Sequence, residues 1–258
     1  MVSFEHGHDA DAAGPPGFPT IVLVHSLGMT RHLWEAQLHG GVLTQDYRVV
    51  APDLPGHGAL ADVPFRIDTA TQRLAGLIDR YAAGRAVVVG LSLGGYVSMR
   101  LAARHPERVA GLVLASCSAD PRGMSALSFR ILAWLIRAVG DRWYAALNTR
   151  LFRRTMPPAI AETQIGAGFY FGALPDVADE LVGRDARAWL TAYSGPVLLL
   201  NGARDPWFRR HEQAFLAACR TARCEVLPGA AHLANLDQPD AFAQTIVHFA
   251  RSIGWEAR

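Results

Sequence analysis

The stretch Val87-Val-Val-Gly90-Leu-Ser92-Leu-Gly94-Gly-Tyr-Val-Ser-Met-Arg100-Leu-Ala-Ala-Arg-His105-Pro106 decides how the rest of the chain is interpreted. Its first residues are β-branched and apolar, which is typical of a buried strand, and residues 93–104 have the apolar spacing of an amphipathic helix. Gly-x-Ser-x-Gly occurs by chance in roughly one chain in ten of this composition, so the strand and helix around it carry the prediction. We expect a sharp turn that holds Ser92 in a strained backbone conformation. The alternative is a serine that only caps the helix.

Short apolar runs bounded by turn residues recur on both sides of this stretch. They do not alternate with polar residues, which favours parallel strands that are covered on both faces. The predicted strands are 20–25, 47–53, 86–90, 109–116, 196–202 and 224–229, and the predicted helices are 69–81, 93–104, 210–219 and 239–253. This order of elements predicts an α/β fold with a doubly wound, mostly parallel sheet.

One interval, residues 119–190, lacks a good strand and contains several helical patterns rich in aromatic side chains. We therefore expect a core formed by residues 1–118 and 191–258, with residues 119–190 inserted as a helical cap. Within the cap, residues 126–139 are apolar on nearly all sides, so we expect a helix that roofs an apolar pocket. A helix packed on the sheet or at a dimer contact is the alternative.

Composition excludes several classes of protein. The 258 residues are half apolar with a net charge of +2, which argues against disorder and nucleic-acid binding. All 25 basic residues are arginine, so mechanisms that need a lysine are excluded. The three cysteines, at positions 117, 219 and 224, have no metal spacing and suit a reducing compartment. No signal peptide or membrane-spanning run is evident, so we expect a cytoplasmic protein without metal, cofactor or membrane contact, as a monomer or homodimer.

A serine becomes a nucleophile only with a base and a group that orients the base. His232 lies in the loop after the last predicted strand, and Asp205 follows the strand before that one. Both loops are expected at the carboxyl edge of the sheet, where Ser92 also emerges. Asp120 follows another strand and is the alternative acid. An oxyanion hole is expected from the backbone N–H groups of Leu27 and Leu93.

These motifs together resemble the α/β-hydrolase fold over roughly residues 20–118 and 195–252. The matching pieces are HSLG (25–28), DLPGHG (53–58), GLSLGG (90–95), NGARD (201–205) and GAAH (229–232). The HSLG loop and the residues around His232 are similar to 3-oxoadipate enol-lactonases and related esterases. The resemblance implies that Ser92 is the nucleophile, His232 the general base and then acid, and Asp205 the orienting carboxylate.

Two departures from this family are visible. Ser26 replaces the usual glycine of the oxyanion loop, and only 19 residues precede the first clear strand, so the usual leading antiparallel hairpin is expected to be shortened or missing. Asp53 and His57 are expected to shape a turn, and Trp34 to pack beneath the oxyanion loop.

The site predicts a serine hydrolase that cleaves an ester or lactone of an apolar or aromatic small molecule. A serine at the elbow argues against the dehalogenase and epoxide hydrolase chemistry of this fold, which uses a carboxylate there. The alternatives are a C–C bond hydrolase or a non-hydrolytic cyclase or lyase with the same triad, and a ligand receptor with incidental turnover. The side chains expected in the substrate pocket are Ser26, Trp134, Trp143, Tyr144, Phe171 and Trp207.

Overall fold

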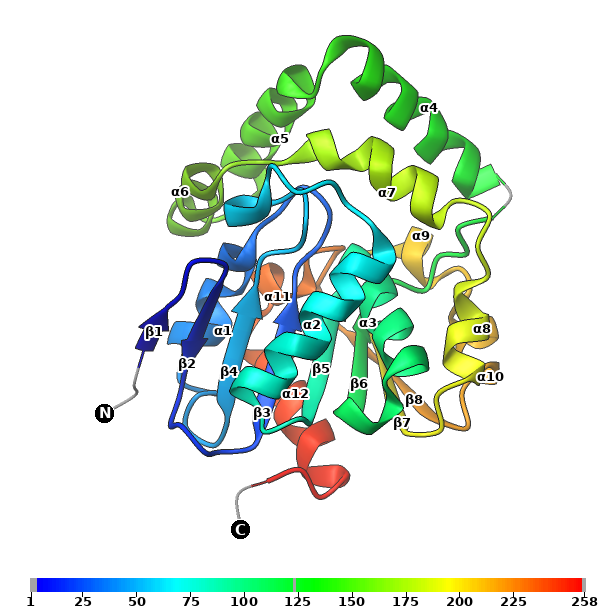
Figure 1. The fold of residues 1–258 in the computed structure, drawn as a ribbon. Coiled ribbons are helices and arrows are strands. Elements are labelled where there is room, and N and C mark those ends of the chain that lie inside the picture. Colours follow the sequence, from blue (N-terminus) through cyan, green and yellow to red (C-terminus); the bar gives the residue numbers. More distant parts are fainter. Residues whose placement is uncertain (1–3, 123, 257–258) are drawn as a thin grey trace.

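A single eight-stranded sheet forms the centre of the computed structural model, which describes residues 4–122 and 124–256 (Figure 1). The strands lie in the order β1-β2-β4-β3-β5-β6-β7-β8. Strands β3 to β8 are parallel, whereas β1 and β2 are antiparallel to their neighbours. The bounds are β1 (Phe4–His6), β2 (Ala10–Ala13), β3 (Thr20–Val24), β4 (Arg48–Pro52), β5 (Ala86–Leu91), β6 (Val109–Ala115), β7 (Pro196–Gly202) and β8 (Thr221–Leu227). The predicted fold class is confirmed.

The leading hairpin was expected to be shortened or missing, and the structure shows that it is shortened. It is present, although short: β1 pairs with β2, and β2 adds to the sheet beside β4. The sequence of β2, Ala-Asp-Ala-Ala, has no β-branched or aromatic residue, so it carries no strand signal of its own. Strand β8 begins earlier than predicted, at Thr221, because this edge strand is partly exposed and its first residues do not form an apolar run.

Helices cover both faces of the sheet, and the strand side chains alternate between two apolar clusters. Val22 and Val24 face the cluster that contains α2, α3, α8 and α10, whereas Ile21 and Leu23 face the cluster of α1, α11 and α12. Trp34 is fully buried in the second cluster, with its ring 5.9 Å from that of Phe242, so the prediction that it packs in the core is confirmed. The bounds of these helices are α1 (Glu35–His39), α2 (Ile67–Tyr81), α3 (Leu93–Arg104), α8 (Ala186–Thr191), α10 (Glu212–Ala217), α11 (Ala234–Asp237) and α12 (Pro239–Ser252).

Four helices lie above the carboxyl edge of the sheet, between β6 and β7 in the chain (Figure 1). They are α4 (Met124–Val139), α5 (Arg142–Thr155), α6 (Pro158–Ala167) and α7 (Leu174–Leu181). Helix α4 packs on α7 and α5 packs on α6. Helix α8 lies within the range predicted for the cap but packs on α3 of the core. The predicted boundary of the cap at residue 190 stays a prediction. None of the helices in the described part of the chain combines the length and apolar character needed to cross a membrane.

Candidate active site

Ser92 occupies the turn between β5 and α3 with φ 52° and ψ −112°. A non-glycine residue rarely adopts a positive φ, so the predicted strain at this position is confirmed. Gly94 permits the turn because a Cβ atom there would lie 2.2 Å from the carbonyl oxygen of Val24. Within the described residues the Ser92 side chain makes no capping hydrogen bond to α3, so it is not a helix cap. The hydroxyl is therefore free to face the cavity beside it.

Asp205 and His232 meet at the carboxyl edge of the sheet. Asp205 follows β7 and His232 follows β8, and Asp205 Oδ2 lies 2.8 Å from His232 Nδ1. The second oxygen, Asp205 Oδ1, accepts a hydrogen bond from the backbone N–H of Phe208 at 3.3 Å, which fixes the carboxylate. The Phe208 ring packs on the imidazole, with 4.3 Å between centroids. A proton on Nδ1 donated to Asp205 leaves the Nε2 lone pair of His232 available as a base.

Two buried histidines hold the loop that contains Leu27. His25 Nε2 accepts a hydrogen bond from the backbone N–H of Leu54 at 2.9 Å, and His57 Nε2 accepts one from Gly28 at 3.0 Å. Each ring places its Nδ1 2.9 Å from a backbone carbonyl oxygen, that of Ser26 for His25 and that of Pro55 for His57. Burial lowers the pKa of His25 to about 4 and that of His57 to about 3, so both rings are neutral near pH 7. Each can then donate from Nδ1 and accept at Nε2.

Asp53 completes the support of this loop. Its carboxylate accepts hydrogen bonds from the backbone N–H of Arg31 at 2.8 Å and of Ala59 at 2.9 Å. The Arg31 guanidinium pairs with Asp53 and with Asp11 of β2. The expectation that Asp53 and His57 shape a turn is thus confirmed, and the short leading hairpin contributes to it. Asp120, the alternative acid, pairs with Arg122 at 2.8 Å and with Arg187 at 3.3 Å.

A mostly apolar cavity of about 120 Å³ opens beside Ser92, between the sheet edge and the cap. Helices α4 and α7 roof it, which agrees with the expected role of the apolar helix. Its lining comprises Leu27, Ser92, Leu93, Tyr96, Ala119, Asp120, Pro121, Ala126, Phe129, Val177, Leu181, Val182, Trp207 and Phe208. Leu27 and Leu93, the two predicted oxyanion donors, both belong to this lining. The structure therefore brings the nucleophile candidate, both donor residues and an apolar surface together.

Of the six side chains expected in the substrate pocket, Trp207 lines this cavity and the other five do not. Trp134 points outward from α4 with 66% of its surface exposed. Phe171 and Tyr144 pack on each other, with ring centroids 4.6 Å apart. Phe171 also covers Gly28, where a Cβ atom would lie 2.3 Å from the ring, so these aromatics attach the cap to the oxyanion loop.

The remaining two expected pocket residues lie elsewhere as well. Trp143 lies on α5 with 39% of its surface exposed, and its ring packs beside that of Tyr144. Ser26 is buried in its loop, and its hydroxyl donates a hydrogen bond to the carbonyl oxygen of Leu27 at 3.5 Å. Three lining aromatics were missed from the sequence: Tyr96, Phe129 and Phe208. Two of them could have been found from their positions in the sequence, because Tyr96 is one helical turn after Ser92 and Phe208 directly follows Trp207.

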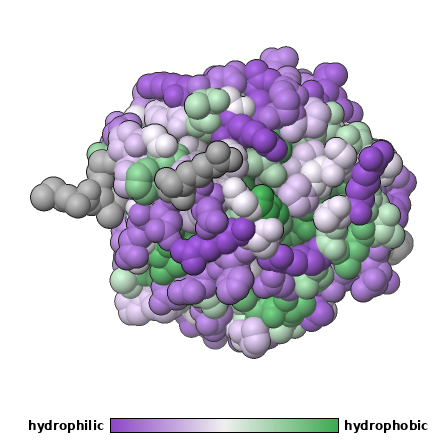
Figure 2. Space-filling model, turned by 90° about the horizontal axis from the view of Figure 1, so that it is seen from below, coloured by the Kyte–Doolittle hydropathy of each residue, from purple (hydrophilic) through white to green (hydrophobic). Residues whose placement is uncertain are grey.

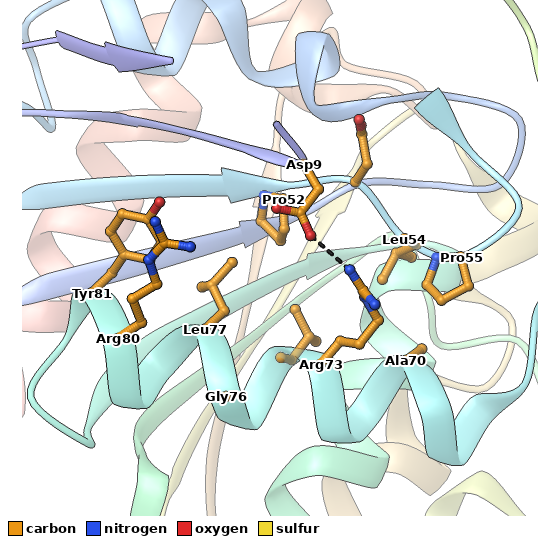
Figure 3. A pocket seen from close by; sticks show the side chains of 12 residues that line it. Asp9, Pro52, Leu54, Pro55, Ala70, Arg73, Gly76, Leu77, Arg80 and Tyr81 are labelled. Atoms are coloured by element: carbon orange, nitrogen blue, oxygen red, sulfur yellow. Dashed lines mark hydrogen bonds and ion pairs between the residues drawn. The ribbon is translucent and has the colours of Figure 1, made fainter. Parts of the chain in front are cut away.

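Two further hollows among the described residues have a different lining. A hollow of about 210 Å³ lies between α2 and β4, where Arg73 pairs with Asp9 at 2.7 Å and Arg80 reaches over Tyr81 (Figure 3). Neither Ser92 nor His232 lines it. A wide hollow on the α5 side is lined by His232 together with Phe152 and Met156. No group of three or more potential metal ligands occurs among residues 4–122 and 124–256.

A family model described as "Alpha/beta hydrolase family" matches residues 21–245. The chain belongs to the alpha/beta hydrolase family. This alpha/beta hydrolase is 28% identical over 242 residues to 3-oxoadipate enol-lactonase 2 of Acinetobacter baylyi, which covers 88% of this chain and 87% of that protein. It is 30% identical over 247 residues to a pimeloyl-[acyl-carrier protein] methyl ester esterase of Neisseria meningitidis, with 89% and 92% covered.

A solved structure with the same architecture is that of a hydrolase from Pseudomonas aeruginosa PA01. It superposes on this alpha/beta hydrolase with a TM-score of 0.78 and 28% sequence identity, covering 96% of this chain and 97% of that one. Family membership and these relatives identify the protein as a hydrolase. They leave its substrate open, because the same fold carries many chemistries.

Proposed function

We propose that this chain is a serine hydrolase that opens a carboxylic ester or lactone through an acyl-enzyme on Ser92. The observation that carries the proposal is the hydrogen bond of 2.8 Å between Asp205 and His232, on the same sheet edge as the strained Ser92 turn. Similarity to an enol-lactonase and to a methyl ester esterase supports the choice of esters and lactones over other carbonyl substrates. The apolar cavity beside Ser92 supports an apolar acyl group.

In the proposed first step, Ser92 Oγ attacks the substrate carbonyl carbon while its proton moves to His232 Nε2. The backbone N–H groups of Leu27 and Leu93 donate hydrogen bonds to the oxyanion, and Asp205 stabilises the imidazolium. The carbon–oxygen bond to the leaving alkoxide then breaks, and the alkoxide takes the proton from His232. For a lactone the leaving hydroxyl stays attached to the acyl group.

In the second step, a water molecule attacks the acyl carbon as His232 Nε2 takes one of its protons. The new oxyanion collapses, the bond to Ser92 Oγ breaks, and Ser92 regains a proton from His232. The product is a carboxylic acid with its hydroxyl partner. No oxidant, metal or cofactor is needed to balance either step.

Labelling with a fluorophosphonate tests the nucleophile. Intact-mass measurement and peptide mapping should find one adduct on Ser92 in the folded protein, none in Ser92→Ala, and an unchanged adduct in Ser194→Ala, which alters an exposed serine. Failure of folded wild-type protein to form the adduct contradicts the proposal. If Ser92 is labelled but a panel of esters and lactones is turned over no faster than by Ser92→Ala, product analysis for C–C bond cleavage or cyclisation decides between the remaining functions.

A further inference from the structure

The outer surface of the cap carries an unusual stripe of large apolar side chains. On α4, Leu127, Ile131 and Trp134 point away from the molecule and are 50%, 58% and 66% exposed. Their spacing places them on one face of the helix, opposite Ala133 and Ile136, which pack inward. The stripe continues on α5 at its exposed positions, namely Trp143, Leu147 and Leu151. Ten large apolar residues are exposed in the described part of the chain, and six of them belong to this stripe. Such a concentration of exposed apolar side chains marks an interaction surface.

Positive charge surrounds the stripe. Residues 124–155 contain six arginines and a single acidic residue, Asp141. Arg137 pairs with Asp179 and Arg153 pairs with Glu162. The other four, all exposed, form no ion pair with any residue that the structure describes: Arg130, Arg142, Arg150 and Arg154. Aromatic and aliphatic side chains flanked by unpaired arginines on a helix face are typical of a helix that lies in a membrane interface.

The charge of the outer face of α4 and α5, and its position in the fold, indicate which kind of partner binds there. A second copy of the chain would bring the same arginines against each other across a symmetric contact, which opposes self-association. An anionic surface instead neutralises them. Helices α4 and α5 form the top of the molecule in the view of Figure 1. The opposite face, seen from below, is mostly hydrophilic with small separate apolar patches (Figure 2).

We propose that the outer face of α4 and α5 docks on the surface of an anionic lipid bilayer. The apolar stripe would enter the boundary between headgroups and acyl chains, with Trp134 and Trp143 at the level of the headgroups and the arginines on the lipid phosphates. This contact differs from the sequence expectation of no membrane partner, which considered only membrane-spanning runs. The docking proposal does not depend on Ser92 chemistry. It concerns the outer face of α4, whereas the inner face of this helix contacts the cavity through Ala126 and Phe129.

Co-sedimentation with lipid vesicles tests the proposal. Wild-type protein should sediment with vesicles of phosphatidylglycerol and phosphatidylcholine at low salt, and much less with phosphatidylcholine alone or at high salt. The variant Leu127→Ser/Ile131→Ser/Trp134→Ser should bind roughly tenfold or more weakly for each side chain that the bilayer buries. The variant Arg142→Gln/Arg150→Gln/Arg154→Gln should bind about fivefold more weakly for each arginine.

Matched controls separate this surface from general stickiness and misfolding. Phe18→Ser and Arg220→Gln remove an exposed apolar side chain and an exposed arginine elsewhere and should bind as wild type does. Circular dichroism and thermal unfolding should be unchanged in every variant, because the altered side chains are exposed. The proposal is overturned if wild-type protein stays in the supernatant with both vesicle types, or if the α4 variant binds as well as wild type. It is equally overturned if light scattering finds a dimer that the α4 variant converts to a monomer, since a second copy then covers the face.

Discussion

His57 Nε2 accepts a hydrogen bond from the backbone N–H of Gly28 at 3.0 Å and thereby joins the DLPGHG loop to the HSLG loop. Gly28 is the neighbour of Leu27, whose N–H is a proposed oxyanion donor. The bond is buried, so its loss leaves the Gly28 N–H without a hydrogen-bond partner and out of reach of water. His57 is therefore a positioning residue for the oxyanion loop.

Replacing His57 by alanine should lower both stability and turnover. The change leaves a buried cavity and an unpaired Gly28 N–H, so we expect the free energy of unfolding to fall by about 2–4 kcal/mol. Urea denaturation measures this loss, and kcat for a simple ester should fall with little change in KM if the loop supports the transition state. The exposed His248→Ala is the matched control and should change neither quantity. Equal kcat values for His57→Ala and wild type would show that the loop keeps its place without this bond.

The two buried histidines, His25 and His57, predict that the protein loses stability in acid. In the unfolded chain they titrate near 6.5, whereas burial lowers the pKa of His25 to about 4 and that of His57 to about 3 in the folded chain. Between these values the unfolded state binds more protons, so stability should fall as pH drops below 6.5. Each ring contributes about 1.4 kcal/mol per pH unit in that range. Urea denaturation between neutral pH and pH about 5 should show this slope, and His57→Ala should show a shallower one.

Asp205→Asn should reduce kcat by about three to four orders of magnitude, because an amide at this position favours the wrong tautomer of His232. Unfolding by urea should show a much smaller change than the kinetics. Asp120→Asn tests the alternative acid and should cost less than about tenfold, since Asp120 pairs with arginines. The reverse order of these two effects would assign the triad acid to Asp120.

Gly94→Ala should prevent the Ser92 turn from forming as it does here. The added Cβ atom would lie 2.2 Å from the Val24 carbonyl oxygen and 2.7 Å from that of His25, and these backbone atoms cannot rotate away as a side chain could. We expect a destabilisation of several kcal/mol, on the order of the largest single-residue effects, measured by urea unfolding. The matched control is Gly76→Ala on α2, where a Cβ atom meets nothing within 4 Å and a gain of about 0.5–1 kcal/mol is expected. Similar stabilities of the two variants would disprove the steric argument.

Phe129→Ala should widen the range of acyl groups accepted. The cavity beside Ser92 holds about 120 Å³, which suits a short acyl chain or a single ring, and Phe129 of α4 forms part of its wall. Relative kcat/KM values for p-nitrophenyl acetate, butyrate and decanoate should favour short chains in the wild type and shift toward decanoate in the variant. The exposed Leu127→Ala on the same helix should leave the ratios unchanged. An unchanged preference in Phe129→Ala would place the acyl group elsewhere.

Most of the fold could be predicted from local sequence patterns. The parallel strands are continuous apolar runs because helices bury them on both faces, so β3 to β7 could be read from single stretches of sequence. The positions of Asp205 and His232 followed from the same reasoning, since loops after parallel strands gather at one edge. Strand β2 was not predicted because its sequence, Ala-Asp-Ala-Ala, has no strand signal of its own, and only its pairing with β4 in the folded chain reveals it.

The sequence by itself determined the order of the parallel strands, the turn that strains Ser92 and the sheet edge at which Asp205 and His232 meet. Only the tertiary structure decided which aromatic side chains face the cavity. Helix α4 is apolar on nearly all sides, so its periodicity could not tell that Phe129 turns inward while Trp134 turns outward. The bond from Gly28 to His57 was equally hidden. Burial of a side chain depends on segments that are distant in sequence and close in space, and no local pattern records those contacts.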